Sequence, residues 1–131
     1  GFTDLVTLEA PVISASSANT ITTNATDAVG FMFDTNMTAD TWWLVGVANN
    51  TDATHQNTGF APVADTYATF AIEVSSAGVA TFYYNGAAVG TKMTGAVTAA
   101  TDLTPTLAVG KLSVAASMSL DWDYAHVSMA R

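Results

Sequence analysis

The sequence predicts an all-β protein, an antiparallel two-sheet β-sandwich or jelly roll. Short segments in which apolar and polar residues alternate recur along the chain, with turn residues between them, and this even spacing is typical of such folds. Two hairpin signals follow one another between residues 67 and 91. No segment carries a credible pattern for an amphipathic helix.

The pair of hairpins is the strongest of these signals. Tyr67–Val74 alternates between two faces, and a turn that ends at Gly78 leads into a second alternating segment, Val79–Tyr84. The dipeptide Asn85-Gly86 then supplies the two successive positive φ angles of a type I′ turn. Ala87–Gly90 closes the meander, so three neighbouring antiparallel strands are predicted here.

Further strands are predicted on both sides of the meander. Trp42–Ala48 is apolar on both faces, which favours a central strand covered on both sides. Asn49–Asp65 is the longest polar segment, and we expect it to be either a functional loop or a packing arm. Met118–Met129 is predicted to be a long last strand. The other predicted strands are Asp4–Ala10, Val12–Ser16, Thr20–Thr23, Gly30–Asp34 and Pro105–Val109.

Length and charge narrow the classes of protein. The 131 residues are expected to form one jelly-roll β-sandwich domain over residues 1–131, with residues 1–28 as an arm or peripheral strands. The chain has no cysteine, which excludes disulfides, thiolate metal sites and a cysteine nucleophile. Its net charge of −8 repels phosphate backbones and anionic lipids, so no nucleic acid and no membrane is expected as a partner.

Three segments carry a family resemblance. In the meander, Ile72-Glu73-Val74 leads through a glycine turn and an aromatic strand to Asn85-Gly86. Ser119–Val127 has an Asp-aromatic-Val pattern, and Val29–Asp34 followed by Thr41–Ala48 is the third segment. In this order and spacing they resemble concanavalin A-like (lectin/glucanase, laminin-G-like) jelly-roll domains of the kind found in bacteriophage virion proteins. The resemblance implies that Ser119–Val127 belongs to the closing strand of the jelly roll.

The resemblance also implies a function. It implies a non-enzymatic structural module of a phage virion, which is a capsid decoration, cement or fibre protein that binds neighbouring capsid or tail subunits. We expect a homo-oligomer, because strand faces rich in Ala and Thr lose little side-chain entropy on burial. The alternative is a carbohydrate-binding, lectin-like module, extracellular or on the virion surface, that recognises host-surface or extracellular glycans. Neither function calls for a cofactor.

The candidate binding residues are aromatic and polar side chains. Adjacent strand residues point to opposite faces, so one of Trp42 and Trp43 is expected on the outer surface, where it can stack on a sugar or anchor a partner. The favoured interpretation is that both are buried, the outer one beneath Asn49–Asp65, and that Tyr83 and Tyr84 serve cross-strand packing. The full set is Trp42, Trp43, Asn50, His55, Asn57, Tyr83, Tyr84 and Asn85.

Calcium is the metal considered for the acidic residues. Asp121 and Asp123 flank Trp122 on one strand face and, with Asp27 or Asp102, offer carboxylate oxygens of the kind that calcium prefers. Calcium needs six to eight oxygens, and no loop with the spacing of a calcium site accompanies them. Solvated carboxylates are therefore the favoured interpretation, and no metal site is predicted.

Catalytic residues are not predicted. Retaining glycosidases need two carboxylates about 5 Å apart, but the only glutamates are Glu9 and Glu73, and Glu73 has no acidic neighbour two residues away. His55 and His126 lie in no pattern that suggests a nucleophile–histidine–acid triad. We therefore expect that the protein is not an enzyme.

Overall fold

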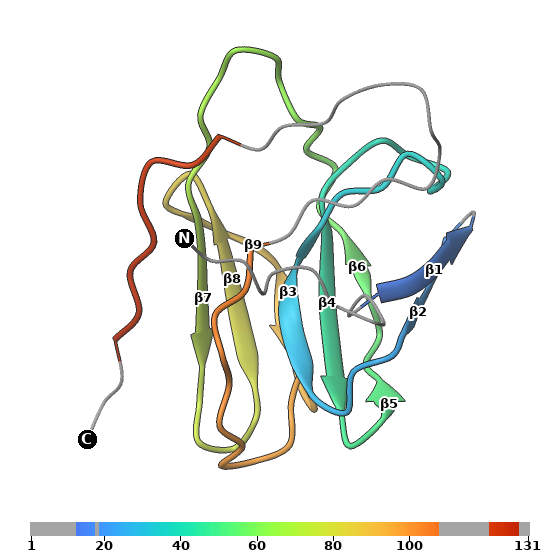
Figure 1. The fold of residues 1–131 in the computed structure, drawn as a ribbon, viewed down its shortest axis with the longest axis vertical. Coiled ribbons are helices and arrows are strands. Elements are labelled where there is room, and N and C mark those ends of the chain that lie inside the picture. Colours follow the sequence, from blue (N-terminus) through green and yellow to red (C-terminus); the bar gives the residue numbers. More distant parts are fainter. Residues whose placement is uncertain (1–12, 18, 108–120, 129–131) are drawn as a thin grey trace, which may run out of the picture. The chain divides into compact units, whose positions relative to one another are not determined.

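The computed structural model describes residues 13–17, 19–107 and 121–128. The chain divides into two units, Gly1–Thr101 and Asp102–Arg131, and each is described by itself. The described residues of the first unit form nine strands, and no helix occurs in the described parts of either unit (Figure 1). The predicted all-β class is therefore confirmed.

The strands of the first unit form three antiparallel sheets. The first sheet is a two-stranded ribbon of β1 and β2, and in the second sheet β4 pairs with β3 on one side and with β5 and β6 on the other. The third sheet has the order β7-β8-β9 (Figure 1). The bounds are β1 Ile13–Ser17, β2 Thr20–Thr23, β3 Ala28–Met32, β4 Trp43–Ala48, β5 Thr51–Asp52, β6 Gln56–Asn57, β7 Phe70–Val74, β8 Ala80–Tyr84 and β9 Ala87–Met93.

The second and third sheets pack against each other as a β-sandwich. Leu44 of β4 and Phe82 of β8 are fully buried in one core cluster, together with Met93 at the end of β9. Phe31 of β3 lies edge-on to Phe82, with ring centroids 5.4 Å apart. Gly46 of β4 permits this close packing, because a Cβ atom there would lie 2.5 Å from the Met93 sulfur.

The other face of β4 is also covered. Trp43 and Val45 alternate with Leu44, and both are buried in a second cluster with Ile21 of β2 and Met37. This arrangement confirms the prediction that the strand is central and covered on both sides. The alternation of β4 therefore serves two separate apolar clusters.

Two tight turns organise the hairpins. Asn85 and Gly86 have φ angles of 50° and 79° between the paired residues Tyr84 and Ala87, as the type I′ prediction requires. Asn49 and Asn50 have φ angles of 48° and 60° and join β4 to β5 in the same way. The predicted loop Asn49–Asp65 is corrected here, since it begins with two short strands that continue the ladder of β4.

A side-chain amide joins the two large sheets at one edge. Gln56 of β6 accepts a hydrogen bond from the Thr91 N–H at 2.8 Å and donates one to the Thr91 carbonyl oxygen at 3.1 Å. These two bonds imitate a pair of strand hydrogen bonds between the second and third sheets. Gly90, with a φ angle of 67°, stands beside this contact, where a Cβ atom would lie 2.6 Å from Gln56 Oε1 and from Leu44 Cδ1.

Some predicted strands are not observed. Residues 105–107 of the predicted strand Pro105–Val109 are not in a strand, and neither are residues 121–128 of Met118–Met129, the last strand. The residues 121–128 are exposed and pair with no described strand, so the alternation of their side chains is not matched by a neighbouring ladder. The predicted strand Asp4–Ala10 lies outside the described residues.

Asp27, between β2 and β3, holds two distant segments. Its Oδ1 atom accepts hydrogen bonds from the N–H of Thr98 at 2.6 Å and from the N–H of Asn49 at 3.3 Å. Hydrogen bonds from Thr98, the side-chain bond most of all and then the backbone bond, lower the pKa of Asp27 below its ordinary value of 3.8. The folded state therefore favours the charged form of the Asp27 carboxylate.

This lowered pKa predicts a pH dependence of stability. The contribution of Asp27 is fully present above its unfolded pKa, about 3.9, and is lost as the pH falls through the lower folded pKa. We expect the melting temperature of the wild type to fall more steeply below about pH 4 than that of Asp27→Asn, which cannot titrate there. Thermal melts of both proteins between pH 2 and pH 7 check this, and parallel curves would contradict it.

Candidate functional site

Five aromatic side chains gather at one end of the sandwich. This aromatic patch consists of Phe33, Trp42, Phe60, Phe70 and Tyr84. Ring centroids lie 5.6 Å apart for Phe33 and Trp42, 4.7 Å for Trp42 and Phe70, and 5.4 Å for Phe70 and Tyr84. Phe60 stacks on Tyr84 at 5.0 Å with an interplanar angle of 20°.

The strand registers explain why these rings meet. Phe70 begins β7 and pairs directly with Tyr84, the last residue of β8. Phe33 and Trp42 stand one residue beyond the last paired residues of β3 and β4, which are Met32 and Trp43. Ends of two hairpins therefore contribute aromatic side chains to the same place.

The aromatic patch is half exposed and packs against the buried core. The exposed fractions are 37% for Phe33, 49% for Phe60 and 40% for Phe70. Phe31 contacts both Phe70, at 4.9 Å, and the buried Phe82, so the patch continues into the core. Such continuity holds the exposed rings in fixed positions.

Backbone hydrogen bonds fix the segment that carries Phe60. The N–H of Trp42 donates to the Phe60 carbonyl oxygen at 2.8 Å, and the N–H of Thr58 donates to the Trp42 carbonyl oxygen at 3.0 Å. Asn57 Oδ1 accepts from the N–H of Gly59 at 2.7 Å and from the Thr41 hydroxyl at 2.8 Å. The indole Nε1 of Trp42 is buried and has no hydrogen-bond partner among the described residues.

The structure brings two of the eight candidate binding residues into the patch, Trp42 and Tyr84. Trp43 is buried on the opposite face of β4. Three polar candidates lie in turns or a short strand: Asn50 in the β4–β5 turn, Asn57 in β6, and Asn85 in the β8–β9 turn. Asn85 Oδ1 accepts a hydrogen bond from the N–H of Thr69 at 2.9 Å.

Tyr83 occupies the outer face of the third sheet. Its hydroxyl donates to Glu73 Oε2 at 2.8 Å, and this hydrogen bond raises the pKa of Tyr83 above 10.0. The Tyr83 side chain therefore contacts Glu73 on the neighbouring strand β7, as the prediction of cross-strand packing requires. It lies away from Tyr84, which takes the other side of β8.

Three patch residues were missed by sequence reasoning: Phe33, Phe60 and Phe70. Phe70 lies in the predicted strand Tyr67–Val74, but only the register of β7 against β8 sets it beside Tyr84. Phe60 lies in a segment without periodicity, and its place follows from hydrogen bonds to Trp42. No local sequence signal marks it.

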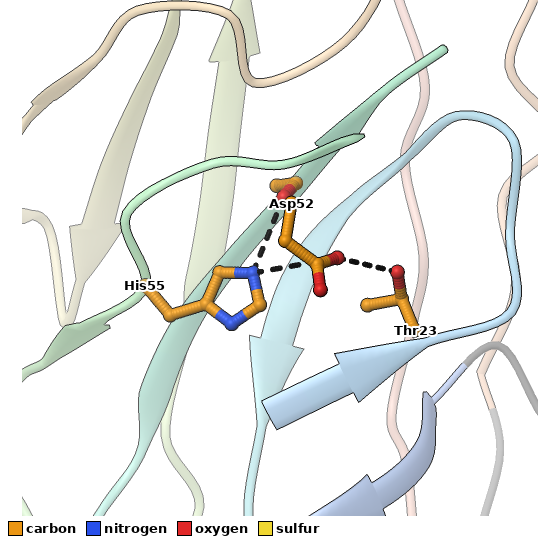
Figure 2. Close-up of polar contacts among 4 residues, drawn as sticks. Thr23, Asp52 and His55 are labelled. Carbon is orange, nitrogen blue, oxygen red and sulfur yellow. Dashed lines mark hydrogen bonds and ion pairs between the residues drawn. The ribbon is translucent and has the colours of Figure 1, made fainter. Parts of the chain in front are cut away.

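His55 belongs to a polar cluster that joins the first sheet, through Thr23 of β2, to the second sheet, through Asp52 of β5 (Figure 2). Its side chain is 8% exposed, and Nε2 lies 3.3 Å from the Gly46 carbonyl oxygen and 3.9 Å from Asp52 Oδ1. The Thr23 hydroxyl donates to Asp52 Oδ1 at 2.5 Å. The hydroxyl thus contacts the carboxylate and not the imidazole, which differs from the order nucleophile–histidine–acid of a catalytic triad. The cluster ties β2, β4 and β5 together.

In the parts of the chain that the structure describes, no group of three or more His, Asp or Glu side chains is close enough together to hold a metal ion. The calcium alternative for Asp121 and Asp123 therefore gains no support from these residues. The two histidines likewise form no shared site with other ligands there.

A polar groove lies on the outer face of the third sheet. Its volume is about 490 Å³, and its walls come from all three strands and from the β7–β8 turn. The lining residues are Glu73, Val74, Ser75, Val79, Thr81 and Lys92. Lys92 also borders a smaller groove of about 280 Å³ that includes Gln56 and Thr91. The arrangement offers one negative and one positive side chain on an otherwise neutral face.

Within the described residues, no helix is long and apolar enough to cross a membrane. Comparison with protein-family models, with curated proteins and with solved structures gives no match for this chain.

Proposed function

We propose that this protein is a non-enzymatic structural module that binds neighbouring protein subunits through the aromatic patch. The observation that carries the proposal is the set of linked, half-exposed rings Phe33, Phe60 and Phe70 at one end of the sandwich. Clustered aromatic rings with a fixed geometry are typical of protein–protein contacts, where a few such anchors supply most of the binding energy.

The virion setting rests on the resemblance described above. A capsid decoration, cement or fibre protein on the capsid or tail surface needs a stable fold and an adhesive surface. The strand pairing on both sides of β4 and the Gln56–Thr91 contact supply the first, and the aromatic patch supplies the second. The partners proposed for the patch are capsid or tail subunits.

The glycan-binding alternative has weaker support. A sugar platform requires an aromatic ring with one open face, whereas Trp43 is buried and Trp42 packs against Phe33 and Phe70. Tyr84 is stacked on Phe60, which leaves Phe60 as the more open of the two rings. A glycan site would therefore centre on Phe60.

The test is binding to virion particles. Purified chain is mixed with heads, and separately with tails, from particles assembled without it, and binding is measured by co-sedimentation. We expect wild-type protein to bind one fraction, and Phe60→Lys to bind at least about thirtyfold more weakly, the effect of losing an aromatic anchor. Thr51→Lys, which adds the same charge at an exposed site on β5, is the control and is expected to bind like the wild type.

Two results would count against the proposal. Failure of the wild type to bind either heads or tails would contradict the virion assignment. Equal binding by Phe60→Lys and Thr51→Lys would contradict the role of the patch. A glycan array run with the same three proteins separates the alternative, which requires a glycan signal that Phe60→Lys loses and Thr51→Lys keeps.

A further inference from the structure

The outer face of the β7-β8-β9 sheet carries two opposite charges that do not pair with each other. We infer that a second copy of this chain docks on this face, with Glu73 of each copy paired to the partner's Lys92 across a two-fold axis. Neither this surface nor this partner is part of the proposed function, and the residues that form the surface lie outside the aromatic patch.

The charge pattern of the chain selects this face. The net charge is −8, so two copies repel each other over most of their surfaces. Lys92 is the one lysine or arginine among the residues that the structure describes, since Lys111 and Arg131 lie outside them. A self-association surface in so acidic a protein is most favourable where this cation is presented.

Both charges remain available for a partner. Lys92 is exposed and has neither a hydrogen bond nor an ion pair to any described residue, although Glu73 lines the same groove. Glu73 accepts one hydrogen bond at Oε2, from Tyr83, and its other carboxylate oxygen accepts none from the described part of the chain. The Tyr83 bond restricts the Glu73 side chain and so lowers the entropy lost on pairing.

The strand register gives the face a two-fold geometry. Glu73 of β7 pairs directly with Thr81 of β8. Ala80 pairs with Met93 and both are buried, so their neighbours Thr81 and Lys92 lie on the outer face. Glu73, Thr81 and Lys92 thus lie on the outer face, one on each of three adjacent strands. A two-fold axis that runs parallel to β8, above the short Thr81 side chain, sets each Glu73 opposite the partner's Lys92, as an isologous interface requires.

The shape of the face suits this pairing. The groove of about 490 Å³ lies around Thr81, between the two charges. Val79, next to the buried Ala80, supplies an apolar wall, against which the methylene groups of the partner's Lys92 pack while its ammonium group reaches Glu73. The neighbouring outward positions on β7 and β9, Ala71 and Ala88, are small, and the Tyr83 ring lies between them on β8.

The experiment is a charge swap in the full chain, read by analytical ultracentrifugation over a concentration series. We expect wild-type protein to dimerise, and both Lys92→Glu and Glu73→Lys to raise the dimer Kd by about tenfold or more, because like charges then face each other. The double variant Glu73→Lys with Lys92→Glu restores opposite pairs and is expected to dimerise within about threefold of the wild type.

The design contains its own control for net charge. Glu73→Lys moves the net charge of −8 two units toward zero and Lys92→Glu moves it two units away, while the double variant has the wild-type composition. A general repulsion between acidic chains would make the two single variants differ in opposite directions. Thermal melts verify that each variant is folded, and the milder Lys92→Gln, which removes one charge, is expected to weaken the dimer by a smaller factor.

Three results would overturn the inference: a wild type that is monomeric at every concentration, single variants that dimerise as tightly as the wild type, or a double variant that fails to recover. Phe60→Lys is expected to leave the dimer Kd unchanged, because Phe60 belongs to the aromatic patch. Loss of virion binding without loss of the dimer, or the reverse, therefore tells which of the two proposals has failed.

Discussion

Phe82→Ala is expected to lower the free energy of unfolding by about 3–5 kcal/mol. Phe82 is fully buried in the middle of β8, between the paired residues Ile72 and Val89. Its ring packs against Leu44 and Phe31 from the facing sheet, so alanine leaves a cavity where the two sheets meet. Urea unfolding followed by circular dichroism measures the change as a lower midpoint with an unchanged slope.

Phe60→Ala is the matched control for this prediction. It removes the same side chain from a site that is 49% exposed, where the main contact is the stacked ring of Tyr84. We expect a loss of no more than about 1.5 kcal/mol. Equal losses for the two variants would show that Phe82 does not join the sheets.

The second large effect is expected at Gly78, where alanine should cost about 2–5 kcal/mol. Gly78 has a φ angle of 73°, which a residue with a Cβ atom adopts only at a cost. A Cβ atom would also overlap the carbonyl oxygen of Val97. The Gly78 carbonyl oxygen accepts hydrogen bonds from the N–H groups of Ala96 and Val97, at 2.9 and 3.3 Å, and the overlap would force these bonds apart.

Gly86→Ala separates the two causes. Gly86 has a similar φ angle of 79°, but a Cβ atom there would have no neighbour within 4 Å. We expect it to cost only the backbone strain, about 1–2 kcal/mol, in the same urea titration. If Gly78→Ala were no more destabilising than Gly86→Ala, the contact between the β7–β8 turn and Val97 would not contribute to stability.

The hairpins show which turns can be predicted from the local sequence and which cannot. Asn85-Gly86 predicted the type I′ turn because few residues other than Asn and Gly adopt positive φ angles at low cost, and the turn is observed. Asn49-Asn50 makes the same kind of turn but was assigned to a loop, since the strand that follows it, β5, has only two residues. A strand of two residues is too short to show a periodic sequence pattern. It forms because its backbone pairs with residues Val47 and Ala48 of β4.

The strand that was predicted for Met118–Met129 illustrates the opposite error. Alternation of apolar and polar residues predicts a strand, but a strand is stable only when a neighbour satisfies its backbone hydrogen bonds. Residues 121–128 have no such neighbour among the described strands. The closing strand that the resemblance implied for Ser119–Val127 is therefore wrong over residues 121–127, and the jelly-roll type stays a prediction.

The sequence by itself determined the all-β class, the meander β7-β8-β9 and the two-sided burial of β4, because alternation and turn residues act between near neighbours. Only the tertiary structure decided which residues form surfaces. It joined Phe60 to Tyr84, Gln56 to Thr91, and Glu73 to the same groove as Lys92. These pairs depend on strand register and on the packing of one sheet against another, which residues far apart in the chain settle together.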